Sequence, residues 1–324
     1  MNYLVLTPDG VGSTYLQRAL TLYLNSSGTD YYNTHELLNG LELDEDNNLY
    51  KRMMGYNQSI DRIVQLIKQN EGNLVSRLAQ YHVENRLNGQ WVERGKIEGT
   101  PEVLERNKKE NYDQLYQTCN DVFKIVYCTR NPFEYALSWS LRNFTGKYNV
   151  YSIQERISTY DKHFSCSVDL KFMVNKLDQY KRYIYWVKDN FKDATEVKYE
   201  DIHEDIDEAL CNITGKEYKF SDSWNFSLQE YTTMLYNLSK IYNKNLTYSD
   251  NFTEYQYSLV KQKKLFRHGI PIKMTTLQDK CKSVVNFLSS LETYNKWAVD
   301  SNEYSPISEQ EILDKIKKED LIYN

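Results

Sequence analysis

The sequence predicts an α/β fold with a mostly parallel central sheet flanked by helices and followed by a helical C-terminal cap. Short apolar runs alternate with longer segments of helical periodicity in the first two thirds of the chain, and only helical patterns follow. Helix breakers are rare, with 5 prolines and 12 glycines in 324 residues, which favours long helices.

Four short apolar runs are the expected strands, at residues 3–6, 74–78, 123–128 and 195–199. The expected helices up to residue 199 span 14–24, 56–69, 101–118, 132–142 and 168–189. Those beyond it span 206–213, 228–242, 253–264, 276–297 and 308–317. No linker composition interrupts the chain, so we expect one domain over residues 1–324, with an α/β core over 1–215 and a helical part over 216–324.

Composition excludes several classes of function. A formal charge of −5 argues against nucleic acid as the main partner, although a local basic pocket is compatible with it. The five cysteines lack metal-ligand spacing, and no metal constellation occurs. No apolar run reaches the roughly eighteen residues of a membrane span, and the first residues do not resemble a signal peptide, so we expect a cytoplasmic protein.

A Gly-rich loop follows the first expected strand, in the sequence TPDGVGSTYLQ at residues 7–17. Gly10 and Gly12 permit a tight turn, and Ser13 and Thr14 add hydroxyl groups where the helix begins. The unpaired N–H groups of residues 11–15 would then face one anion, such as a phosphate or a sulfate-like group. A simple Gly-rich turn with Ser13 as helix cap explains the same residues.

The loop departs from two common nucleotide-binding patterns. No lysine precedes Ser13, which disfavours a P-loop kinase or nucleoside triphosphatase, and Tyr15 occupies the position of the third glycine of a dinucleotide-binding fingerprint.

A second informative stretch is KIVYCTRNPFEYALSWS, residues 124–140. Asn131 is a suitable N-cap, Pro132 fits the first helical position and Glu134 the third. Arg130 would emerge at the carboxyl end of the sheet, where it can bind a phosphate in a bidentate way, and Ser138 could add a hydroxyl. A capped helix with a surface arginine is the alternative reading of the same residues.

The pattern R-N-P-x-E-x-A-x-S after an apolar strand resembles the 3′-phosphate motif of sulfotransferases that use 3′-phosphoadenosine 5′-phosphosulfate (PAPS). By this resemblance Arg130 and Ser138 would hold the 3′-phosphate of the nucleotide. The first loop resembles the 5′-phosphosulfate loop of that family, and EVKYEDI at residues 196–202 is similar to its Y-E-D-L segment. The residues that would bind the nucleotide are Gly10, Val11, Gly12, Ser13, Thr14, Tyr15, Arg130, Ser138, Tyr199 and Arg267.

The resemblance implies transfer of a sulfuryl group from PAPS to a hydroxyl or amine of an unidentified acceptor, a glycan or a small molecule, with no metal. It also makes residues 1–215 the nucleotide-binding core. One departure is that the family usually carries Lys or Arg two positions before Gly12, where this chain has Gly10. Either another cation replaces it or the chain is a non-catalytic nucleotide- or glycan-binding relative. The candidate cations are Arg77, Lys264, Arg267 and Lys273.

A catalytic base is the remaining requirement. His82 follows the second expected strand, where many sulfotransferases carry a catalytic histidine, and Glu84 is the second candidate. A histidine at such a place is also commonly structural.

Arg267 belongs to the basic stretch KKLFRHGIPIK, residues 263–273, which faintly resembles a late R-K-G segment of the family; a solvated loop explains it equally well.

Overall fold

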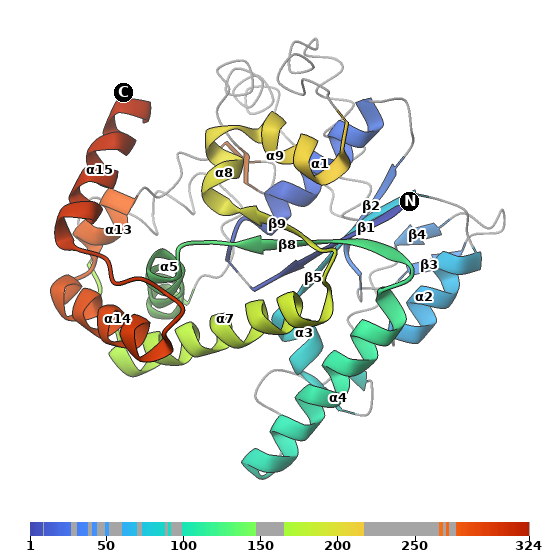
Figure 1. The fold of residues 1–324 in the computed structure, drawn as a ribbon, viewed down its shortest axis with the longest axis horizontal. Helices are drawn as coiled ribbons and strands as arrows, with labels where there is room; N and C mark the ends of the chain where they lie inside the picture. The colour runs from blue at the N-terminus through green and yellow to red at the C-terminus, as the bar shows by residue number, and fades with distance from the viewer. Residues whose placement is uncertain are drawn as a thin grey trace. The chain divides into compact units, whose positions relative to one another are not determined.

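The protein is described by a computed structural model, and the ribbon is shown in Figure 1. The described residues are 1–8, 10–26, 31–37, 41–43, 49–51, 60–69, 73–87, 90–91, 99–146, 165–216, 266–267, 270–271 and 277–323. The helices expected at 228–242 and 253–264 lie outside them.

A five-stranded parallel sheet in the order β2-β5-β1-β8-β9 confirms the predicted fold class. Four of its strands are the predicted ones: β1 (Asn2–Thr7), β5 (Asn73–Ala79), β8 (Phe123–Thr129) and β9 (Thr195–Lys198). The edge strand β2 (Tyr31–Glu36) was not predicted. Tyr199, expected to end a strand, is instead the first residue of helix α8 (Tyr199–Glu204).

Helices connect these parallel strands, as parallel pairing requires. From β1 the chain passes through α1 (Ser13–Ser26) to the edge strand β2, whereas α4 (Pro101–Cys119) leads in the opposite direction from β5 to β8. Right-handed crossovers in opposite directions place their helices on opposite faces of a sheet. Figure 1 shows this arrangement, with α1 and α9 (Ile206–Thr214) on one face and α4 on the other.

The change of direction occurs beside β1, which lies between β5 and β8 in the sheet. Ligands of open α/β sheets bind outside the carboxyl ends of the strands at such a point. Strand β1 is buried from Tyr3 to Thr7 and is paired with β5 on one side and β8 on the other. The sheet therefore fixes the position at which the following loop starts. The Gly-rich loop therefore begins where the topology favours a ligand.

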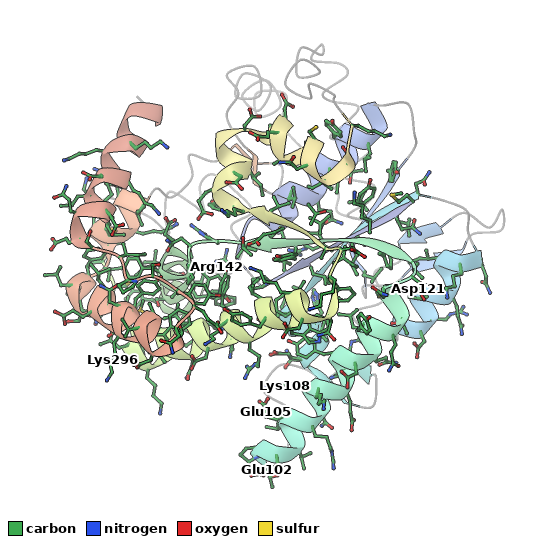
Figure 2. All side chains as sticks on the ribbon, viewed as in Figure 1. Glu102, Glu105, Lys108, Asp121, Arg142 and Lys296 are labelled. Carbon is green, nitrogen blue, oxygen red and sulfur yellow. The ribbon has the colours of Figure 1, made fainter. Side chains whose placement is uncertain are left out.

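Charged residues cover the outer side of α4, as Figure 2 shows for Glu102, Glu105 and Lys108. Lys108 Nζ lies 2.7 Å from Glu105 Oε1, one helical turn earlier. The opposite side of α4 is buried at Tyr112 and Leu115. This division into two faces is the pattern expected of a helix packed on a sheet.

Several shorter elements also occur among the described residues. Helices α2 (Ile60–Gln69) and α3 (Gln80–Glu84) flank β5 in the sequence. Three two-stranded antiparallel ribbons pair β3 with β4, β6 with β7 and β10 with β11. Their bounds are Leu41–Leu43, Leu49–Lys51, Arg86–Leu87, Gln90–Trp91, Phe266–Arg267 and Ile270–Pro271.

The chain forms two compact units. The first combines Met1–Thr129 with Tyr183–Lys264 and contains the parallel sheet, and the second combines Arg130–Arg182 with Leu265–Asn324. The predicted organisation as a single domain, 1–324, stays a prediction.

Helices build the second unit: α5 (Pro132–Thr145), the first part of α7 (Leu170–Asn190), α13 (Leu277–Ser283), α14 (Phe287–Ser301) and α15 (Glu309–Tyr323). The helical character predicted for the C-terminal part is thus confirmed for α13, α14 and α15, whereas residues 266–267 and 270–271 of that part form the ribbon of β10 and β11.

The single helix predicted over 276–297 is wrong, because α13 and α14 are separate helices. Val284 forms a β-bridge with Cys166, and the Asn286 side chain exchanges hydrogen bonds with the backbone of Val168, at 2.8 and 2.9 Å. These long-range contacts replace helical hydrogen bonds at the break. The apolar core of this unit joins its five described helices through residues such as Phe133, Leu177, Leu277, Tyr294 and Ile312.

Candidate functional site

The Gly-rich loop adopts a backbone that only glycine accepts readily. Gly10 has φ of 89° and Gly12 has φ of 76°, both in the left-handed region. Leu16 N donates to Gly12 O at 3.1 Å, so Gly12 is where the hydrogen-bonding of α1 begins. The N–H groups of the first turn have no acceptor within the helix, which makes this end of α1 suited to an anion.

Tyr199 closes one side of this loop. A Cβ atom added to Gly12 would lie 2.7 Å from Tyr199 Cδ2 and 2.8 Å from Cε2, closer than real Cβ contacts. The ring of Tyr199 therefore lies against the Gly12 backbone, and glycine is needed there for space as well as for its φ angle. Tyr199 was predicted to bind the nucleotide, and its contact with the loop places it beside the predicted anion site.

Arg77 brings a positive charge to the start of α1. Its Nη1 atom lies 3.4 Å from Ser13 Oγ, and Ser13 is 3% exposed. The same guanidinium acts on Cys128, whose pKa burial raises to about 12 while the Arg77 charge opposes that rise. Arg77 is thus the described candidate that lies beside the loop lacking the usual cation.

The other candidate cations are less informative. Lys264 and Lys273 lie outside the described residues, and Arg267 lies in β10 without a described side chain. The side chains of Thr14 and Tyr15 are likewise outside the described part, whereas Val11 is fully buried.

Helix α5, in the second informative stretch (residues 124–140), begins with the expected helix cap. The Asn131 side chain accepts from Phe133 N at 3.0 Å and from Glu134 N at 3.3 Å, and Pro132 is the first residue of α5. Helix α5 ends at Gly146, whose φ of 65° is typical of a left-handed C-cap. The predicted cap and start of this helix are confirmed, and the helix continues to Thr145 rather than ending at residue 142 as expected.

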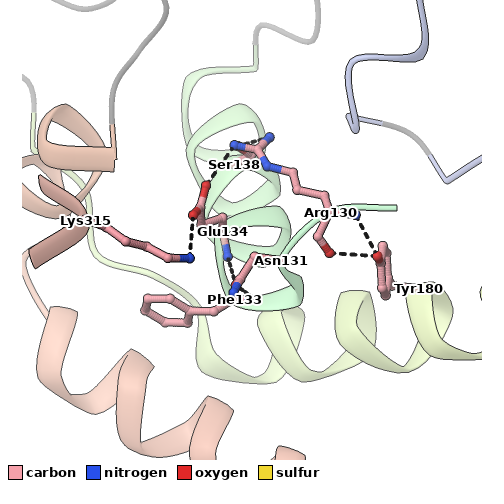
Figure 3. A network of polar contacts seen from close by, with 7 residues as sticks. All are labelled: Arg130, Asn131, Phe133, Glu134, Ser138, Tyr180 and Lys315. Atoms are coloured by element: carbon pink, nitrogen blue, oxygen red, sulfur yellow. Dashed lines mark hydrogen bonds and ion pairs between the residues drawn. The ribbon is translucent and has the colours of Figure 1, made fainter. Parts of the chain in front are cut away.

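Arg130, immediately before this cap, is buried with a side chain that is 5% exposed. Its Nη1 donates to Ser138 Oγ at 3.3 Å, and its Nη2 lies 3.4 Å from Glu134 Oε2. Figure 3 shows these contacts on one side of α5. The structure thus brings together Arg130 and Ser138, the pair predicted to bind the 3′-phosphate, and corrects the alternative of a surface arginine.

The backbone of Arg130 is held as well as its side chain. The Tyr180 hydroxyl accepts from Arg130 N at 2.9 Å and donates to Arg130 O at 2.7 Å. Tyr180 lies in α7 and is 2% exposed, so both bonds are shielded from water. Sequence reasoning missed Tyr180, because no local pattern indicates which of the 29 tyrosines contacts Arg130.

Glu134 is ionised although it is buried. Burial alone would raise its pKa, but Arg130, Lys280 and Lys315 together hold the pKa below its ordinary value. Arg130 therefore lies beside a negatively charged carboxylate that other cations also stabilise.

The two candidate bases both make internal contacts. His82 is fully buried, and its Nδ1 accepts a long hydrogen bond, 3.4 Å, from Ala79 N. Glu84 Oε1 accepts from Tyr112 Oη at 2.6 Å and from Gln80 Nε2 at 2.9 Å. Their roles in proton transfer stay predictions.

Neither a metal site nor a membrane span is found in the described part of the chain. No three His, Cys, Asp or Glu side chains gather there as metal ligands would. None of the described helices combines the length and apolar character that crossing a membrane requires. The cytoplasmic location stays a prediction.

Comparison with known proteins gives a limited result. No protein-family model matches the chain, and no curated protein matches it. Among solved structures, a sulfotransferase from Alicyclobacillus acidocaldarius is 12% identical, with a TM-score of 0.36, over 76% of this chain and 98% of the other. A retinol dehydratase in complex with androsterone and the inactive cofactor PAP is 13% identical, with a TM-score of 0.38, over 95% of this chain and 82% of the other.

Proposed function

We propose that this protein transfers a sulfuryl group from PAPS to a hydroxyl or amine of an acceptor, a small molecule or a glycan. The observation that carries the proposal is the buried pair Arg130 and Ser138, joined at 3.3 Å in the motif that resembles a 3′-phosphate site. A buried guanidinium beside a hydroxyl offers several donors to a phosphate.

In this proposal the Gly-rich loop binds the 5′-phosphosulfate. The N–H groups at the start of α1 and the Ser13 hydroxyl donate to its oxygens, and Arg77 supplies the positive charge that Gly10 lacks. The S–O bond to the 5′-phosphate breaks as a bond forms between sulfur and the acceptor atom. The leaving adenosine 3′,5′-bisphosphate gains negative charge, which the cation and the N–H groups stabilise.

The acceptor also loses a proton, which His82 or Glu84 would take. No metal is needed in this scheme, because the positive charges come from arginines and from backbone N–H groups.

A non-catalytic binding protein is the second candidate function, and the geometry of His82 favours it. In a neutral imidazole whose Nδ1 accepts from Ala79 N, the proton lies on Nε2, so that nitrogen cannot accept another. Glu84 is likewise engaged by Tyr112 and Gln80. A chain of this kind would keep the nucleotide site and lack turnover.

Calorimetry with adenosine 3′,5′-bisphosphate tests the nucleotide site. Wild-type protein should bind it, and Arg130→Ala should weaken it far more than adenosine 5′-phosphate, because only the bisphosphate carries a 3′-phosphate. Arg142→Ala, on the same helix, is the matched control and should change neither ligand. Absence of binding to the wild type would refute the proposal, and equal losses for both ligands would refute the 3′-phosphate assignment.

A transfer assay separates the two candidate functions. Wild-type protein is incubated with labelled PAPS and a panel of glycans and small molecules with hydroxyl or amine groups. Labelled product supports the enzyme, whereas bisphosphate binding without transfer to any acceptor supports the binding protein. In an active protein, full turnover of His82→Ala or Glu84→Gln with normal nucleotide binding would remove that residue as the base.

A further inference from the structure

Glu134 is paired with two cations: Arg130, four residues earlier in the phosphate motif, and Lys315, from a distant part of the sequence. Its Oε2 lies 3.4 Å from Arg130 Nη2, and its Oε1 lies 3.6 Å from Lys315 Nζ in the C-terminal helix α15. Figure 3 shows the carboxylate between the two cations. The Glu134 side chain is 11% exposed, so both interactions are only partly screened by water.

Packing within the second unit determines where Lys315 lies. Ile312 is 1% exposed in the core of this unit, and Ile316 packs against the same core. Lys315 lies three residues after Ile312 and one before Ile316, so it is next to the buried side of α15. Ser308 precedes the helix and exchanges hydrogen bonds with Glu311, which fixes its start.

The charges around Glu134 do not balance. Arg130, Lys280 and Lys315 each act on the Glu134 carboxylate, and Lys315 also acts on Glu311, four residues earlier in α15, so three positive charges face two negative ones. Lys280, in α13, is 7% exposed. With Arg130 alone, the carboxylate would neutralise the guanidinium and repel an incoming anion. The lysines offset its charge and leave the region around Arg130 positive.

We propose that Lys315 is a positioning residue of the phosphate site: it holds the Glu134 carboxylate from the side opposite Arg130, so that Arg130 and Ser138 can bind an anion. This inference rests on the proposed function, because the anion is taken to be the 3′-phosphate of adenosine 3′,5′-bisphosphate. It makes α15 part of the binding machinery.

Titration calorimetry at low salt tests the inference with adenosine 3′,5′-bisphosphate and adenosine 5′-phosphate. Lys315→Met should weaken the bisphosphate about fivefold, the effect of a partly exposed ion pair, and leave adenosine 5′-phosphate unchanged. Lys315→Arg should restore binding. The matched control is Lys317→Met on the same helix. The Lys317 side chain is 72% exposed and its Nζ lies 3.8 Å from Asp314 Oδ1, so this change should have no effect.

A double-mutant cycle tests whether Lys315 acts through Glu134. In a Glu134→Gln background the carboxylate charge is absent, so Lys315→Met should then cost little bisphosphate affinity. An equal loss in both backgrounds would overturn the positioning role and indicate that Lys315 acts on the phosphate directly. Thermal unfolding of each variant identifies any that is not folded. Lys315→Arg and Glu134→Gln replace each side chain by one of similar size, so they test the charges if Lys315→Met does not fold.

The outcomes distinguish this inference from the proposed function. If the wild type binds no bisphosphate, both fall. If the wild type binds it and Lys315→Met behaves like Lys317→Met, only the role of Lys315 falls. A selective loss that Lys315→Arg restores and Glu134→Gln removes supports both.

Discussion

Arg77 Nη1 lies 3.4 Å from Ser13 Oγ, so an arginine of strand β5 reaches the first residue of helix α1. The two residues are 64 positions apart in the sequence. They come together because β5 and β1 are adjacent parallel strands whose carboxyl ends meet at one edge of the sheet. The positive charge missing at Gly10 can thus be supplied by a neighbouring strand.

Replacement of Arg77 tests whether this arginine supplies the positive charge that is missing at Gly10. Arg77→Met should lower the rate of sulfuryl transfer about a hundredfold, because the charge that stabilises the leaving phosphate is lost. Arg77→Lys should retain part of the rate. Arg106→Met, in which an exposed arginine of α4 is removed, is the control and should be unchanged. Normal turnover of a folded Arg77→Met protein would contradict the role given to Arg77.

Gly12→Ala should destabilise the protein more than an ordinary glycine replacement. The positive φ costs about 1 kcal/mol for alanine, and the new Cβ would also meet the Tyr199 ring at 2.7 Å. Gly215→Ala is a matched control in the same unit, since its φ is 68° and no atom lies within 4 Å of the added Cβ. Urea unfolding should show the larger loss for Gly12→Ala, and equal losses would argue against the contact with Tyr199.

Tyr180→Phe should weaken both stability and bisphosphate binding. The variant leaves the buried N–H and C=O of Arg130 without the hydroxyl, at a cost of about 1–3 kcal/mol. Tyr294→Phe is the control, because that hydroxyl bonds Ser305 O at 3.2 Å in the same unit. Calorimetry should show weaker bisphosphate binding only for Tyr180→Phe. Unchanged affinity in that variant would show that the Arg130 backbone needs no such support.

Glu134 should make stability depend on pH in the acid range. Its pKa is lowered in the folded protein, so its stabilising contribution is present above the ordinary glutamate pKa, about 4.3, and is lost as pH falls through the lower folded value. The free energy of unfolding of the wild type should therefore fall relative to Glu134→Gln below about pH 4.3. Urea titrations of both proteins at a series of pH values measure this difference. A difference that stays constant with pH would contradict the charged network around Arg130.

Sequence reasoning succeeded where the signals are local. Helix α5 was predicted from Asn131 and Pro132, and the structure shows the cap and the start as expected. Arg130 and Ser138 were predicted to act together. They lie eight positions apart across the start of α5, and the structure places Arg130 Nη1 3.3 Å from Ser138 Oγ. Such features depend on residues within about two helical turns of one another.

Strand β2 and the break between α13 and α14 were not predicted, and β2 shows the reason. Its sequence, YYNTHE, contains polar residues at consecutive positions and no apolar alternation. It is a strand because it pairs with β5, and its register shifts between Asn33 and His35. The break between α13 and α14 has a similar origin, because Val284 and Asn286 contact residues more than a hundred positions away. Neither feature has a local sequence signal.

The sequence by itself determined the alternation of strands and helices, the glycine backbone of the first loop and the capped start of α5, because these follow from periodicity, allowed φ angles and helix caps. Only the tertiary structure decided that Arg77 lies at Ser13, that Tyr180 holds the Arg130 backbone and that Lys315 pairs with Glu134. These contacts join residues 50 or more positions apart, and the packing of whole strands and helices selects them.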